Sequence, residues 1–172
     1  MATILSYVIV LVLLLAAELF YFRIADRFNI IDKPNERSSH NYITIRGGGI
    51  IWWAAALLFL LFHFSSQGLL FFAGITLIAG VSFWDDVQNL GQRVRLLFHL
   101  LAMSCAFYQA GVFGVYPWLA IVIGYIVFIG IVNAYNFMDG INGITGLYSL
   151  AVLGSLQYVN LSYGNFVHPD LI

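Results

Sequence analysis

Long apolar stretches alternate with short polar segments along the whole chain. Six stretches are long enough, or nearly so, to cross about 30 Å of hydrocarbon at ~1.5 Å per helical residue. They cover residues 3–22, 48–64, 69–84, 96–113, 117–137 and 141–160. The pattern predicts an all-α fold: a polytopic transmembrane bundle of about six helices, forming a single domain over 1–172. The second and third stretches are short, and a tight helical hairpin that turns at Ser65-Ser66-Gln67-Gly68 is an alternative for them.

The composition supports a membrane protein. The 172 residues are 62% hydrophobic and 9% charged, whereas about a quarter of the residues in soluble domains are charged. Lipid must therefore be the solvent for much of the apolar surface. Seven basic residues in such a chain do not form a stripe that follows nucleic-acid phosphates, so nucleic acid is not an expected partner. The single cysteine, Cys105, permits no internal disulfide and gives no indication of compartment.

The basic residues set the orientation of the bundle. All seven lie in alternate loops or at their edges, at Arg23, Arg27, Lys33, Arg37, Arg46, Arg93 and Arg95. By the positive-inside rule, segments 23–47, 85–95 and 138–140 face the cytoplasm and the N-terminus is extracytoplasmic. The first stretch ends in charged residues rather than a small-residue cleavage site, which favours an uncleaved first helix in the plasma (inner) membrane.

Most acidic residues gather on the same predicted face. They are Asp26, Asp32, Glu36, Asp85, Asp86 and Asp139, with Glu18 about one turn inside. Asp170 falls on the opposite side. The cost of placing a carboxylate in the bilayer, about 2.5–3.5 kcal/mol or more, would scatter acids over both faces. One-sided gathering indicates a polar site at the cytoplasmic ends of the helices.

The first polar segment covers Asp32 to His40 and continues to Arg46-Gly47-Gly48-Gly49. Its Ser, His and Arg side chains offer donors to anionic oxygens. Three glycines that open a helix leave backbone N–H groups bare, where a phosphate can approach. The alternative is a basic loop that sets topology, followed by glycines that let helices pack closely.

The second polar segment is Phe83-Trp84-Asp85-Asp86-Val87-Gln88-Asn89, at the predicted end of the third helix. Two adjacent carboxylates repel unless a cation lies between them, and Mg²⁺ prefers such hard oxygen ligands. The alternative is a solvated helix end beside Arg93 and Arg95.

The third polar segment contains Asn133, Asn136 and Asp139 at spacings of three residues. All three can share one helix face near the lipid–water boundary. Asp139-Gly140 and Asn142-Gly143 also favour a tight reversal of the chain, which is the competing interpretation. A turn does not explain the two amides one and two turns earlier, which would need partners if buried. We therefore favour a functional role.

No functional role is predicted for the histidines outside these segments. His63 and His168 fall on the extracytoplasmic side and are expected at the membrane interface, and His99 is expected to serve helix packing.

In this order, the three segments resemble those of the polyprenyl-phosphate N-acetylhexosamine-1-phosphate transferases. The matching pieces are Asp32–Arg37 with Arg46-Gly-Gly-Gly, the Asp85-Asp86 pair, and Asn133-x-x-Asn136-x-x-Asp139-Gly140. Such enzymes pass a sugar-1-phosphate from a UDP-sugar to polyprenyl (undecaprenyl) phosphate and release UMP, with Mg²⁺ (or Mn²⁺) as cofactor. This step initiates a lipid-linked cell-envelope glycan.

The resemblance also implies roles for single residues. Asp85, Asp86 and Asp139 would be catalytic, with Asp86 and Asp139 as metal ligands. Asn133, Asn136, Arg37, His40 and Arg46 would bind substrate. The expected partners are the lipid phosphate, the UDP-sugar and the membrane, and a homodimer is compatible with the sequence.

Two departures from the family pattern stand out. Asn89 is neutral where some members carry a charged residue. Members usually have ten or eleven helices, and their later half supplies a Gly-Asp-x-Gly-Ser type metal-binding segment that is not found in this sequence. We therefore expect the chain to represent the N-terminal part of such an enzyme and to be inactive alone. The competing classes are a membrane transporter or channel, which would carry polar residues through the bilayer, and a non-catalytic membrane subunit.

Overall fold

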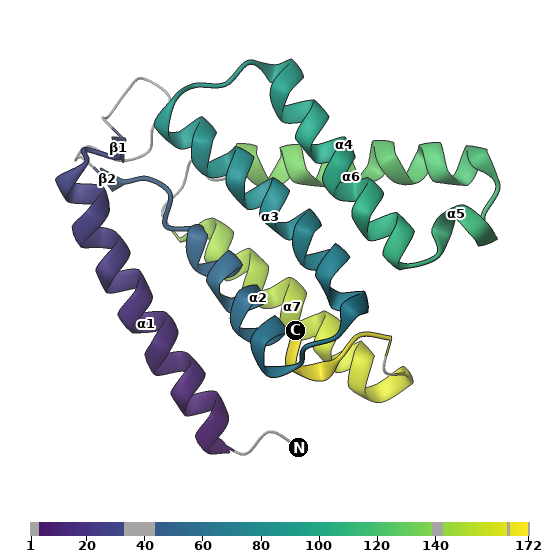
Figure 1. Ribbon diagram of the computed structural model, residues 1–172, viewed down its shortest axis with the longest axis horizontal. Coiled ribbons are helices and arrows are strands. Elements are labelled where there is room, and N and C mark those ends of the chain that lie inside the picture. The colour runs from purple at the N-terminus through teal and green to yellow at the C-terminus, as the bar shows by residue number, and fades with distance from the viewer. Residues whose placement is uncertain (1–3, 33–43, 139–142, 165, 172) are drawn as a thin grey trace.

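The chain forms a bundle of antiparallel helices (Figure 1). The computed structural model describes residues 4–32, 44–138, 143–164 and 166–171. Its long helices are α1 (Ile4–Arg27), α2 (Ile50–Phe62), α3 (Ser66–Val87), α4 (Gln92–Gln109), α6 (Trp118–Met138) and α7 (Ile144–Tyr163). Each corresponds to one of the six apolar stretches, which confirms the predicted all-α fold.

Short elements connect these helices. They are α5 (Val112–Val115), the 3₁₀ helix η1 (Pro169–Leu171), and the strands β1 (Ile31–Asp32) and β2 (Thr44–Ile45). The strands pair antiparallel, with Ile31 opposite Ile45. Gly111 precedes α5 with a φ of 68°, a left-handed conformation that glycine adopts without strain. None of these short elements was predicted, because their apolar runs are too short to show a period.

The helices α2 and α3 form the tight hairpin that the sequence allowed. The Ser65 hydroxyl caps α3 by accepting a 3.0 Å hydrogen bond from the Gly68 N–H. Trp53 of α2 donates from Nε1 to the Thr76 hydroxyl of α3 at 3.0 Å. With 13 residues, α2 is about 19 Å long and shorter than the hydrocarbon core.

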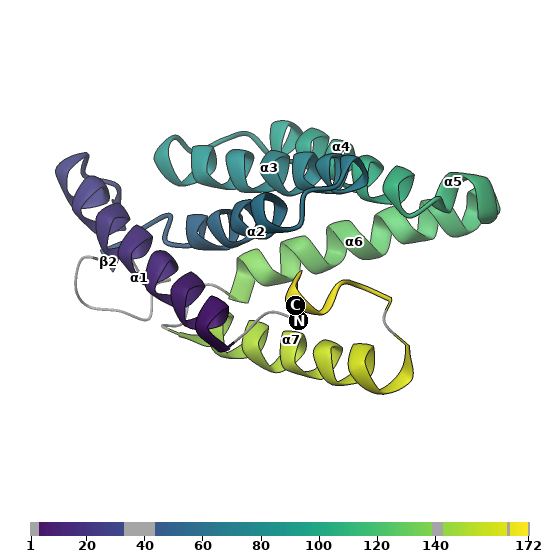
Figure 2. The same cartoon turned by 60° about the horizontal axis from the view of Figure 1, so that its bottom comes forward.

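The helices α3 and α4 make the most extensive contact in the described chain. Gly74 allows it, because a Cβ there would lie 2.9 Å from the Ala102 carbonyl oxygen. Ser104 of α4 and Tyr125 of α6 share a 2.7 Å hydrogen bond between their hydroxyls. Figure 2 shows α3 and α4 at the top, α7 at the bottom, and α2 and α6 between them.

The surface of the bundle is suited to lipid. Within the part of the chain that the structure describes, three helices are long and apolar enough to cross a membrane, at Ile4–Arg27, Gly68–Val87 and Trp118–Met138. Large apolar side chains such as Leu5, Ile126 and Leu147 are exposed. Such continuous exposed apolar surface is not compatible with water as the only solvent. The chain is therefore a membrane protein.

Candidate functional site

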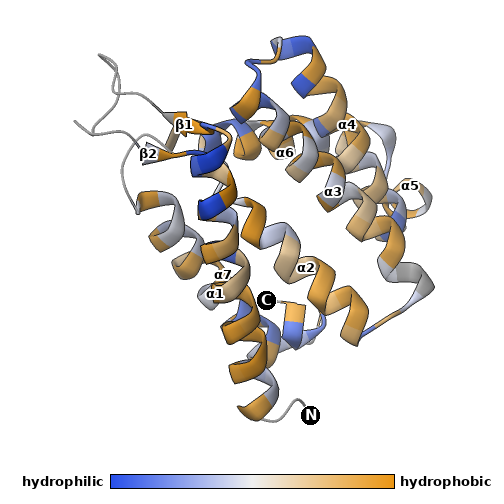
Figure 3. Cartoon of the chain, turned by 60° about the vertical axis from the view of Figure 1, so that its left-hand side comes forward, coloured by the Kyte–Doolittle hydropathy of each residue, from blue (hydrophilic) through white to orange (hydrophobic). Residues whose placement is uncertain are grey.

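Six helix ends gather at one end of the bundle, which we call the polar end. They are the C-terminal ends of α1, α3 and α6 and the N-terminal ends of α2, α4 and α7, at the upper left in Figure 1. Figure 3 shows hydrophilic segments near β1, β2 and the α3–α4 turn, while α1 and α2 are largely hydrophobic along their length. This arrangement brings the first and second polar segments of the sequence together.

Asp85 holds the turn between α3 and α4. Its Oδ1 accepts a 2.6 Å hydrogen bond from the Leu90 N–H, and its Oδ2 lies 3.0 Å from Nη1 of Arg95. The side chains of Asp85 and Arg95 are 24% and 30% exposed, so water screens the ion pair only in part. Arg95 can reach back because α4 begins at Gln92, earlier than its apolar stretch predicted.

Asp86, the next residue, lines a small cavity together with Arg46 and Asn89. The cavity has a volume of about 240 Å³, and the segment from Phe28 to Ile31 also lines it. Arg46 and Asp86 come from two sequence segments that were predicted separately to contribute to one site. The cavity combines a guanidinium, a carboxylate and an amide, which is suited to an anion bound with or without a metal ion.

Backbone contacts fix Arg46 at this cavity. Its N–H donates to the Ile30 carbonyl at 3.1 Å, and its carbonyl accepts a hydrogen bond from the hydroxyl of the buried Tyr21. Gly47 follows with a φ of 76°, and a Cβ there would overlap the Tyr21 hydroxyl and approach Phe83 to 3.1 Å. A glycine is therefore required at this position.

The three glycines before α2 accept hydrogen bonds from the first N–H groups of that helix. The N–H groups of Ile50, Ile51 and Trp52 donate to the carbonyls of Gly47, Gly48 and Gly49 at 3.1–3.2 Å. These 3₁₀-type bonds satisfy the first three donors of α2, whereas binding of a phosphate at the glycines stays a prediction. The structure favours the alternative of close packing at Gly47 and Gly48, because a Cβ on Gly48 would lie 3.2 Å from Glu18 Oε1.

Glu18 lies beside these glycines, inside the polar end. Among the described residues, its Oε2 is buried and has no hydrogen-bond partner. The Tyr21 hydroxyl is within electrostatic range of both Glu18 and Asp86. We did not assign Glu18 to the site from the sequence, although its position one turn inside the acidic face was a usable signal. Asn89 was given no role because it is neutral.

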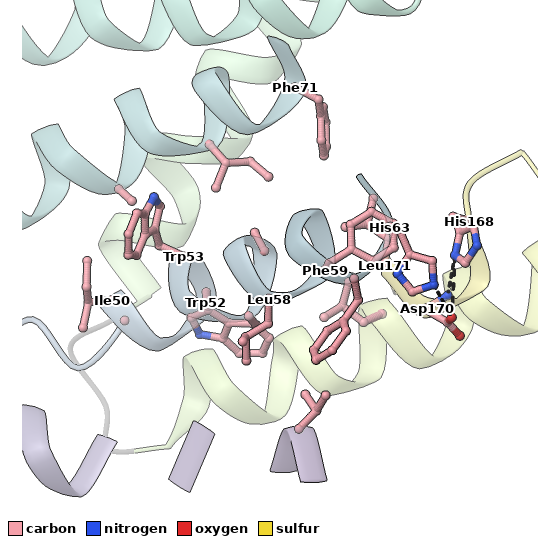
Figure 4. A pocket seen from close by; sticks show the side chains of 18 of the residues that line it. Ile50, Trp52, Trp53, Leu58, Phe59, His63, Phe71, His168, Asp170 and Leu171 are labelled. Carbon is pink, nitrogen blue, oxygen red and sulfur yellow. Dashed lines mark hydrogen bonds and ion pairs between the residues drawn. The ribbon is translucent and has the colours of Figure 1, made fainter. Parts of the chain in front are cut away.

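Asp86 also lines a much larger apolar cavity. This cavity has a volume of about 1580 Å³ and runs along α2 from Gly47 and Asp86 to His63 and Asp170. Ile50 lies near its Gly47 end, and Trp53, Leu58 and Phe59 line the part that leads to His63 (Figure 4). Asp86 is therefore the residue that lines both the small polar cavity and the long apolar one.

Two predicted site residues in the described part of the chain, Asn133 and Asn136, are not brought into these cavities. Asn133 and Asn136 lie in the last turns of α6, and both are exposed, so the burial we considered for them is not found. They are not among the residues that line either cavity. Asp139, Arg37 and His40 lie outside the described residues.

The bundle and its polar end define a class of protein: an integral membrane protein with a polar cavity, lined by Arg46 and Asp86, at its helix ends. The model of the family described as Glycosyl transferase family 4 matches residues 68–170, which is more than half of the chain. The chain belongs to this family, whose members are membrane sugar-phosphate transferases. No curated protein and no solved structure gave a match.

Proposed function

We propose that the chain takes part in transferring N-acetylhexosamine-1-phosphate from a UDP-sugar to polyprenyl phosphate. The reaction would occur at the cytoplasmic face of the plasma (inner) membrane and initiate a lipid-linked cell-envelope glycan. One observation carries the proposal: Asp86 lines both the small polar cavity and the long apolar one. This arrangement matches a substrate with a phosphate at one end and a hydrocarbon chain at the other.

The chemistry needs charge neutralisation more than a strong base. A phosphate monoester has a second pKa near 6, so the lipid phosphate is largely ionised at pH 7 and is itself a nucleophile. Both substrates are anionic, and the reaction depends on neutralising and aligning them for in-line displacement. Arg46 would hold an anionic oxygen by charge-assisted hydrogen bonds, and Asn89 would donate from its amide.

Mg²⁺ fits this site through Asp86. Mg²⁺ usually takes one or two carboxylates together with substrate phosphates, so we propose Asp86 and Asp139 as the ligands that this chain contributes. Bound there, the ion would neutralise the charge that develops on the transferred phosphoryl group. Both oxygens of Asp85 are engaged by Leu90 and Arg95, which supports a positioning role for Asp85. A catalytic role for it stays a prediction.

The nucleotide-sugar would be bound by the other predicted residues. We propose that Asn133 and Asn136 contact it from α6, with Arg37 and His40 as further donors. We also propose that turnover requires the metal-binding Gly-Asp-x-Gly-Ser type segment of the family, which this sequence does not contain. Binding of the lipid is therefore the direct test of this chain.

The experiment compares polyprenyl phosphate with polyprenol, which lacks the phosphate, by equilibrium binding to the purified chain in micelles. We expect the phosphate to bind at least about tenfold more tightly, since each charge-assisted contact contributes more than about 1.4 kcal/mol. Arg46→Gln should remove this preference and leave polyprenol binding unchanged.

A matched variant tests the apolar cavity. Trp52 lines this cavity. Trp52→Ala should lower the affinity for polyprenyl phosphate and for polyprenol by the same factor. Equal binding of polyprenyl phosphate and polyprenol by the unmodified chain would contradict the proposed phosphate site.

A further inference from the structure

Three metal-ligating side chains lie together at the end of the long cavity that is opposite to Asp86. His63 follows the last residue of α2, and His168 and Asp170 belong to the segment around η1, after α7. Figure 4 shows the two imidazoles and the carboxylate directed toward one another. They lie about 19 Å from the polar end, the length of the 13-residue α2, so they are a separate cluster.

The distances within this cluster are short. Asp170 Oδ2 lies 3.2 Å from Nε2 of His63 and 3.9 Å from Nδ1 of His168. The two imidazole centroids are 4.5 Å apart. One ligand atom from each of the three residues lies within 4.8 Å of the others.

This set suits a divalent transition-metal ion. Two imidazoles and one carboxylate are a ligand combination that Zn²⁺ uses in proteins, with bonds of about 2.0–2.2 Å. Ligands at that distance around a tetrahedral ion are about 3.3 Å apart. His63 and Asp170 are already at this separation, and the other pairs need to close by at most about 1.5 Å. The side chains of His63 and His168 are 36% and 49% exposed, which gives an ion access and leaves room for that adjustment.

Neighbouring aromatic residues hold the ligands in place. Phe59 stacks on the His63 ring at 4.9 Å and meets the His168 ring edge-on at 5.4 Å. Tyr7 of α1 donates a 2.7 Å hydrogen bond to Asp170 Oδ1, which leaves Oδ2 directed at the imidazoles. Such outer hydrogen bonds orient metal ligands and raise metal affinity.

We propose that His63, His168 and Asp170 bind one Zn²⁺ ion, with water in the fourth position. The ion would link the end of α2 to η1 and, through Tyr7, to α1. It would therefore fix the end of the bundle that is remote from the proposed transferase site. This site is independent of the proposed function, and imidazole ligands distinguish it from a Mg²⁺ site, which takes oxygen ligands.

The test is Zn²⁺ binding to the purified chain in micelles, after removal of any histidine tag. We expect one Zn²⁺ per chain and no displacement by excess Mg²⁺. Asp170→Asn should weaken binding at least about tenfold, and Tyr7→Phe, which keeps the ring, about tenfold. His99→Gln, at a histidine of α4 that does not belong to the cluster, is the matched control and should bind as the unmodified chain does.

A second measurement guards against variants that fail to fold. Co²⁺ added to the unmodified chain should give the intense visible absorption of a tetrahedral site, and Zn²⁺ should abolish it. Binding of less than one Zn²⁺ per chain would overturn the proposal. So would a double variant, His63→Gln with His168→Gln, that binds Zn²⁺ as tightly as the unmodified chain. The cluster would then be a set of hydrogen bonds and ion pairs without a metal.

Discussion

The adjacent residues Asp85 and Asp86 have different surroundings. Asp85 is held by the Leu90 N–H and the Arg95 guanidinium, whereas Asp86 lines both cavities. Successive residues of a helix point about 100° apart, so one carboxylate can close the turn while the other faces the cavity. The sequence predicted a pair of carboxylates but not which of them would form an ion pair and which would line the cavities. That difference depends on which carboxylate the Arg95 side chain contacts in the folded chain.

Breaking the ion pair should destabilise the α3–α4 turn. Asp85→Asn keeps the acceptor for Leu90 and removes the charge, so we expect a loss of about 1 kcal/mol of unfolding free energy. Arg95→Gln should lose a similar amount, and the double variant little more than either single one. The test is to measure the unfolding free energies of the two single variants and the double variant in micelles. The exposed Arg93, in the same turn of α4, provides the control: Arg93→Gln should change nothing. Additive losses would contradict the pairing.

Single residues also show where sequence reasoning ended. Arg46 and Asp86 were both predicted from local chemistry, and the structure places them at one cavity. Asn89 and Glu18 were missed as site residues, because their positions depend on how α1, α2 and α3 meet. Asn133 and Asn136 share a region of α6 as predicted but remain exposed.

At the scale of elements, apolar stretches located all six long helices, because a bilayer requires long continuous apolar segments. Boundaries were less accurate where polar residues continue a helix. α1 extends to Arg27, and α4 begins before Arg93 and Arg95. The paired strands could not be predicted, since a two-residue strand has no detectable period.

The junction of α1 and α2 gives a prediction at this scale. Gly47→Ala should destabilise the chain by roughly 1–3 kcal/mol, because the new Cβ overlaps the Tyr21 hydroxyl and the backbone has a positive φ. Gly49→Ala is the matched control. It has a φ of −59° and nothing within 4 Å of a Cβ, so it should be tolerated. The unfolding temperatures of the two variants in micelles test this prediction. Equal unfolding temperatures would contradict the packing of Gly47 against Tyr21.

For the whole molecule, the bundle has two distinct ends joined by apolar helices. The arginines in the described part of the chain lie at the polar end, and the cluster of His63, His168 and Asp170 lies at the other end. The positive-inside rule then predicts that the polar end is cytoplasmic. This orientation is a prediction from the sequence.

Cysteine labelling tests the orientation. In a Cys105→Ser background, we expect Phe64→Cys, at the exposed α2–α3 turn, to react with a membrane-impermeant maleimide in intact cells. Gln92→Cys, at the exposed start of α4, should react only after permeabilisation. The reverse pattern would contradict the assigned topology and move the proposed site to the other face.

The central claim is that Asp86 and Arg46 form part of a site for sugar-phosphate transfer to a lipid phosphate. The most direct measurement is release of labelled UMP from a UDP-sugar in membranes of cells that lack the native copy. These cells carry an intact, full-length form that also contains the metal-binding Gly-Asp-x-Gly-Ser type segment, either unmodified or with Asp86→Asn. We predict release that depends on polyprenyl phosphate and Mg²⁺, lowered by about 100-fold or more in Asp86→Asn, as for removal of a group that stabilises the transition state. Undiminished release with Asp86→Asn would contradict this account.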